Sequence, residues 1–125
     1  MTPYIYIFVR QDSALTVAQQ MVQSCHAVYQ MAQRYRQNDP SLIPALILIG
    51  VSDKAALFRV ISKLNDNAIG HEVFYEPDDN LGLTAIATEP LTQEQRRTLS
   101  NYRLWRNDVA PAPTYMLVPQ CPQYR

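Results

Sequence analysis

The sequence predicts a single-domain α/β fold, with a four-stranded mixed sheet and helices packed on it in the order β-α-β-α-β-β-α. Residues 4–10 are β-branched or aromatic at nearly every position, which is typical of a central strand covered on both faces. Two segments with apolar residues at helical spacing each follow a strand-like segment, which favours parallel strands. The last two strand-like segments are joined by a short loop, which favours an added antiparallel or edge strand.

The first helix follows the first strand closely. Asp12 and Ser13 end the strand, and Thr16 caps a helix over residues 17–37, with Gln19 at the capping-box distance. Apolar residues recur along this helix at steps of three and four and predict its buried face. They are Val17, Met21, Cys25, Val28, Ala32 and Tyr35.

The later elements are bounded by turn and cap residues. Pro40 lies in the break after the first helix, and either Ser52 or Asp53 caps the second one. Gly70 closes the second helix, and Thr92 opens a third helix of about ten residues. The three remaining strands are predicted at Leu46–Val51, His71–Tyr75 and Leu83–Thr88, with an acidic loop at Glu76–Asn80.

The predicted domain covers residues 1–106, and residues 107–125 form a Pro-rich C-terminal tail with a short apolar run at Tyr115–Val118. The chain has 125 residues, of which 47% are hydrophobic, enough for one domain with a buried core. No segment is long and apolar enough to span a bilayer, and the N-terminus does not resemble a signal peptide, so a cytoplasmic protein is expected. Cys25 is expected to be a small core residue, and Cys121 lies in the tail.

The net charge of +0 gives the chain no overall attraction for nucleic acid, but the charges are unevenly distributed. Residues 91–107 are rich in arginine, which fits either a solvated helix face or a modest phosphate contact. Residues 72–79 are acidic, and solvation is the simplest role for Asp78 and Asp79. We find no Gly-rich phosphate loop and no metal-ligand spacing, and we expect neither a metal nor a cofactor.

His26 is the residue that most invites a functional interpretation. On a helix over residues 17–37 it lies in a polar, uncharged stripe with Gln19, Gln23, Gln30 and Gln33. Such a stripe can line a site, and an imidazole can act as a general base near neutral pH. Asp12 could orient His26 or a water molecule, or simply cap a turn, and Gln19 could act only in the capping box.

Three segments in order carry a resemblance to a known family. They are Arg10-Gln11-Asp12 at a strand end, Gln23-Ser24-Cys25-His26-Ala27 on the first helix, and Thr84-Ala85-Ile86-Ala87-Thr88-Glu89-Pro90 on the last strand. Over residues 4–104 the chain resembles the type II peptidyl-tRNA hydrolases, which cleave the ester between a peptide and the 3′ end of tRNA.

The resemblance implies a site in which water attacks an ester carbonyl. It implies catalytic roles for His26 and Asp12, with Asp78 or else Asp79 in place of the family's aspartate, and substrate-binding roles for Arg10, Gln19, Gln23 and Thr84. Two segments depart from the family. Gln19 stands where the family has a lysine, and residues 76–82 are shorter than the family's Asp-Ala-Gly-x-Thr-Gln loop and lack its threonine.

Two functions of different classes follow. The first is hydrolysis of peptidyl-tRNA or a related acyl-tRNA, with tRNA as the partner. The second is a non-catalytic protein on the same scaffold, which uses the pocket to hold tRNA, a small ligand or a protein, and which the missing lysine favours. No membrane partner is expected, and a homodimer is left open.

Overall fold

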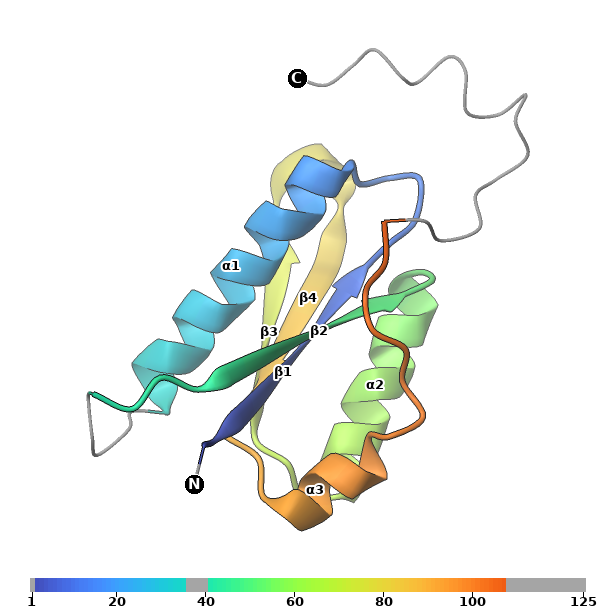
Figure 1. Cartoon of the computed structure of the whole chain (residues 1–125). Coiled ribbons are helices and arrows are strands. Elements are labelled where there is room, and N and C mark those ends of the chain that lie inside the picture. Colours follow the sequence, from blue (N-terminus) through green and yellow to red (C-terminus); the bar gives the residue numbers. More distant parts are fainter. Residues whose placement is uncertain (1, 36–40, 108–125) are drawn as a thin grey trace.

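The computed structural model describes residues 2–35 and 41–107, and these residues form the α/β domain that the sequence predicts. The elements are β1 (Tyr4–Arg10), α1 (Val17–Arg34), β2 (Ala45–Val51), α2 (Lys54–Asp66), β3 (His71–Glu76), the short 3₁₀ helix η1 (Asp78–Asn80), β4 (Gly82–Thr88) and α3 (Gln93–Thr98). Figure 1 shows the four strands as one twisted sheet between α1 and α2.

The sheet has the strand order β2-β1-β4-β3. β1 is parallel to β2 and antiparallel to β4, and β3 is antiparallel to β4. The antiparallel strand that the sequence predicts is therefore β4, but it lies inside the sheet, between β1 and β3. For this reason the second expected parallel pairing does not form. β4 suits an inner position because the side chains of residues 83–88 are buried on both faces of the strand.

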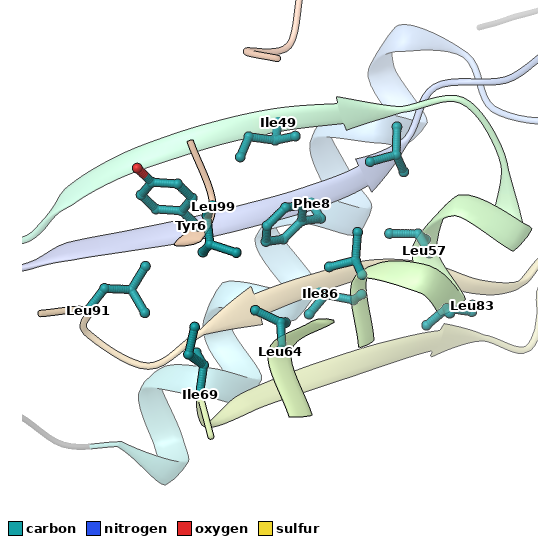
Figure 2. Close-up of a cluster of buried hydrophobic side chains, with 12 residues drawn as sticks. Tyr6, Phe8, Ile49, Leu57, Leu64, Ile69, Leu83, Ile86, Leu91 and Leu99 are labelled. Atoms are coloured by element: carbon teal, nitrogen blue, oxygen red, sulfur yellow. The ribbon is translucent and has the colours of Figure 1, made fainter. Parts of the chain in front are cut away.

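The two faces of the sheet hold separate hydrophobic clusters. Tyr6 and Phe8 point to the α2 side, whereas Ile5, Ile7 and Val9 point to the α1 side, as the period of two in a strand requires. Figure 2 shows the α2 side, where Phe8, Leu57 and Leu64 are fully buried. Each such side chain stabilises the fold by about 1.5–3 kcal/mol through its burial.

Local cap chemistry sets the helix ends. Thr16 and Gln19 form the expected capping box at the start of α1, and Thr92 and Gln95 form another at the start of α3. Asp53, rather than Ser52, caps α2 by accepting a hydrogen bond from the backbone N–H of Ala56 at 2.8 Å. α1 ends at Arg34, three residues earlier than expected, and α3 has six residues instead of about ten.

The prediction for the buried face of α1 was wrong. The buried residues are Gln20, Gln23, Ser24, Ala27 and Met31. Val17 and Met21 are 47% and 39% exposed, and Cys25, expected in the core, is exposed as well. A polar face can be buried here because its groups find partners. Ser24 donates to the carbonyl of Gln20 at 2.8 Å, and the indole N–H of Trp105 donates to Gln20 Oε1 at 2.7 Å.

The chain crosses the outer edge of β2 after α3. Leu104 forms an antiparallel bridge with Ile49, and the backbone N–H of Trp105 donates to the carbonyl of Leu48 at 2.8 Å. The predicted C-terminal tail lies outside the described residues from 108 onward, together with Tyr115–Val118 and Cys121. Within the described ranges, no helix is both long enough and apolar enough to cross a membrane.

Candidate functional site

Arg10, the last residue of β1, holds the chain at the start of β4 in place. Its side chain is buried, and Nη1 donates to the carbonyls of Leu81 and Leu83 at 2.7 and 3.2 Å. Nε and Nη2 donate to Oδ2 of Asp12 at 3.2 and 3.1 Å, so the two side chains form an ion pair. Arg10 and Asp12 therefore tie the chain before β4 to the end of β1 rather than facing an open pocket.

Gln23 joins α1 to both β3 and β4. Its Nε2 donates to Glu76 Oε1 at 2.8 Å, and its Oε1 accepts a hydrogen bond from Thr84 Oγ1 at 2.7 Å. Gln23 and Thr84 are both buried. Thr84 thus acts through Gln23, and Gln23 in turn fixes the carboxylate of Glu76.

A cavity of about 260 Å³ lies between the first half of α1 and the loop that precedes β4. Its polar lining consists of Gln19, Gln23, Glu76, Asp78 and Asp79, and its apolar walls come from Ala18, Val22 and Leu81. The volume is slightly below the range of typical small-molecule pockets, which suits a short acyl group. Every ionisable group in this lining is a carboxylate.

The loop that presents Asp78 and Asp79 has an unusual backbone. Asp79 and Asn80 adopt left-handed conformations with φ of 54° and 55°, and Gly82 follows at 69°. Aspartate and asparagine tolerate this region better than most residues, and glycine adopts it freely. Strained backbone of this kind is found preferentially at functional sites. The side chain of Glu76 supports the loop by accepting from the backbone N–H of Asp78 at 3.4 Å.

Gln19 has both of the roles that the sequence left open. Its Oε1 accepts from the backbone N–H of Thr16 at 2.8 Å, and its own N–H donates to Thr16 Oγ1 at 3.1 Å, so it completes the capping box. It also lines the cavity. Because Oε1 is occupied in the cap, Nε2 is the group through which this amide can serve a ligand.

His26 is outside the lining of this cavity. Its exposed ring stacks on Phe74, with the ring centroids 4.4 Å apart and the planes 15° apart. It lies ten residues beyond the cap Thr16, or about 15 Å along the helix axis. The structure therefore does not bring His26 and Asp12 together, and Asp12 does not orient its imidazole.

The uncharged stripe on α1 is mainly a contact with the edge strand β3. Gln23 binds Glu76, and Gln30 Nε2 donates to Glu72 Oε1 at 3.2 Å and to the carbonyl of Val73 at 2.9 Å. Arg34 adds an ion pair to Glu72 at 3.0 Å. Amides suit these positions because a carboxylate on α1 would face the carboxylates of β3.

The sequence did not single out Glu76, which the structure places in the lining beside Asp78. The signal was present, because Glu76 ends a strand and starts the acidic loop. A second cavity, of about 330 Å³, lies beside Val51 and Ser52 at the end of β2, and its charged lining residues are Arg103 and Arg106. In the part of the chain that the structure describes, no three His, Cys, Asp or Glu side chains gather into a group that could hold a metal ion.

No protein-family model matches this sequence, and no curated protein matches it either.

Proposed function

We propose that the chain is a peptidyl-tRNA hydrolase-like protein of the cytoplasm, which hydrolyses the ester bond of a peptidyl-tRNA or a related acyl-tRNA by attack of water. The supporting observation is the cavity that collects Gln19 and Gln23 from α1 and Asp78 from the loop before β4. The resemblance assigned site roles to all three residues from sequence alone. Three others, Arg10, Asp12 and Thr84, brace the same cavity from behind.

The carboxylate of Asp78 is the proposed general base. It would take a proton from the water as the water oxygen bonds to the ester carbon, and return that proton to the 3′ oxygen of the tRNA as the ester C–O bond breaks. Proton transfer to a positioned side chain typically contributes 10²–10⁴-fold to a rate. Gln19 Nε2 would donate a hydrogen bond to the ester carbonyl, on which negative charge develops. Gln23 is a positioning residue, because both ends of its amide are already bound to Thr84 and Glu76.

His26 has a different proposed role from the one that the resemblance implies. Its exposed ring on α1 stacks on Phe74 of β3, and Gln23 lies three residues before it on the same helix. Bases at the end of a nucleic acid stack on aromatic surfaces, each with about 1–3 kcal/mol. His26 is therefore proposed to hold the terminal base of the tRNA, while the acyl group enters the cavity.

One observation favours the non-catalytic function as a second candidate. Among the described residues, the cavity lining includes three carboxylates and no cation, and Gln19 stands where the family that the sequence resembles has lysine. A neutral amide stabilises an oxyanion less than an ammonium group, and the loss of one strong donor commonly costs about 2.7–4 kcal/mol of barrier. A protein that only binds a ligand, for example a ligand that carries an amino group, has no need for this cation.

The experiment measures release of N-acetylated amino acid from an N-acetyl-aminoacyl-tRNA in a single turnover. Asp78→Asn should slow release by about 10²-fold or more, because the general base is lost. Asp66→Asn is the matched control, since Asp66 is an exposed carboxylate at the end of α2. Gln19→Lys should accelerate release, because it returns a cation to the cavity.

Hydrolysis is contradicted if the folded wild type and Gln19→Lys both release product no faster than the uncatalysed reaction. Binding of the same acyl-tRNA by those proteins would then support the second candidate. A rate that Asp78→Asn and Asp66→Asn lower equally would instead remove Asp78 from the site.

A further inference from the structure

One flank of α1 has an apolar stripe that residues 2–35 and 41–107 leave largely uncovered. The residues are Met21, Cys25, Val28, Ala32 and Tyr35, and we name them the α1 seam. Met21, Cys25 and Ala32 are exposed, whereas Val28 and Tyr35 are half-buried. The helix packs chiefly against β1, β3 and β4, which places the seam on its β2 side.

The spacing of the seam indicates what kind of surface covers it. The five residues follow one another at steps of four, three, four and three, which is the a/d spacing of a coiled-coil contact between two helices. The larger side chains of Met21, Val28 and Tyr35 alternate with the small ones of Cys25 and Ala32, which lets a partner helix approach closely. The seam runs about 21 Å along the helix axis.

The apolar surface continues from the seam onto the start of β2. A cavity of about 470 Å³ lies between Val28, Ala32 and Tyr35 on one side and Leu42, Ile43 and Leu46 on the other. Ile43 is 81% exposed and Leu46 is 54% exposed. A continuous apolar surface of this extent on a folded domain marks a contact with another macromolecule.

The charges of α1 indicate that this macromolecule is a second copy of the chain. Residues 13–33 include no Asp, Glu, Lys or Arg, and Arg34 is the single such residue within α1. In a twofold dimer the residues near the symmetry axis meet their own counterparts, so a charge at those positions would face a like charge. An uncharged seam avoids that repulsion, and the net charge of +0 leaves no long-range repulsion between copies.

We propose that the α1 seam, with Leu42, Ile43 and Leu46, is the interface of a homodimer in which α1 packs against α1 of a second copy. The Gln19 and Gln23 cavity lies on the β3 side of the same helix, so the dimer leaves it open. This interface does not depend on the proposed hydrolase function.

Light scattering after size-exclusion chromatography tests the dimer over a range of protein concentrations. The chain mass is 14.3 kDa, and the wild type should approach twice that value as its concentration rises through the micromolar range. Ala32→Glu should raise the dissociation constant at least tenfold, because each copy brings a carboxylate into an apolar contact. Gln33→Glu is the matched control with the same added charge, since Gln33 is exposed outside the seam. It should change the constant less than twofold.

A second readout does not require a mutant. Cys25 is exposed in the single chain, so a maleimide should alkylate it rapidly at low protein concentration and slowly once dimers form. A wild type that keeps the mass of one chain and an unchanged Cys25 alkylation rate up to about 0.5 mM would overturn the proposal. Equal weakening by Ala32→Glu and Gln33→Glu would also overturn it, because the seam would then not be the contact.

Discussion

Replacing Arg10 with methionine tests whether this residue braces the loop of the site. Methionine keeps most of the volume but removes the hydrogen bonds to the buried carbonyls of Leu81 and Leu83 and to Asp12. A buried acceptor left without a donor costs about 1–3 kcal/mol. Asp12 is 23% exposed, so water replaces part of its lost contact. We therefore expect a loss of about 3 kcal/mol in the free energy of unfolding, or about 12 °C in Tm for a chain of this size.

Urea unfolding, followed by circular dichroism at 222 nm, measures that loss. Arg34→Met is the matched control, because the Arg34 side chain is 66% exposed and its ion pair with Glu72 should contribute less than about 0.5 kcal/mol. The reasoning fails if Arg10→Met costs less than about 1 kcal/mol, or no more than Arg34→Met, at an unchanged denaturant slope. The loop before β4 would then be held by its own backbone.

Three further predictions concern stability. Gln23→Glu places a second carboxylate against Glu76, so repulsion between like charges should make the variant less stable relative to wild type at pH 7 than at pH 5. Equal differences in urea midpoint at both pH values would contradict this. Burial raises the pKa of Tyr102 above 10.0, partly opposed by Arg59, so its contribution is complete below pH 10.0 and is lost as the pH rises through the folded value. Tyr102→Phe should therefore flatten the alkaline fall in stability, and an unchanged slope would argue against it. Gly82→Ala should lower the free energy of unfolding by about 1 kcal/mol because Gly82 has a φ of 69°, whereas Ala68→Gly should raise it by about 0.5–1 kcal/mol because Ala68 has a φ of 55°. Thermal unfolding that shifts the Tm of both variants in the same direction would refute this.

The strands and the helix starts could be predicted because their signals are local. β1 has apolar residues on both faces, and Thr16 and Thr92 each lie three residues before a glutamine that completes a capping box. The buried face of α1 could not be predicted in this way. Periodicity locates an apolar stripe, but it cannot tell whether the stripe faces the sheet or another molecule. The polar residue Gln20 is buried because its partner is Trp105, which is 85 residues away.

The candidate site shows the same division between local and distant information. Gln19, Gln23 and Asp78 were singled out from sequence, and the structure places all three in one lining. Of the roles left open for Asp12, orienting His26 does not fit the rise of the helix between them, whereas Asp12 Oδ1 does accept from the backbone N–H of Ala14 at 3.0 Å in the turn. Thr84 was expected to bind a substrate, yet its hydroxyl is buried and bound to Gln23, a contact that depends on the place of β4 inside the sheet.

The place of β4 also bears on how the domain forms during translation. β4 is the last strand to be synthesised, but it separates β1 from β3 and pairs with both. Until residues 82–88 leave the ribosome, β1 and β3 each have an unpaired edge that can bind to another nascent chain. A pause in translation before residues 82–88 have emerged should therefore lower the yield of folded protein more than an equal pause after they have emerged, since all four strands are then available.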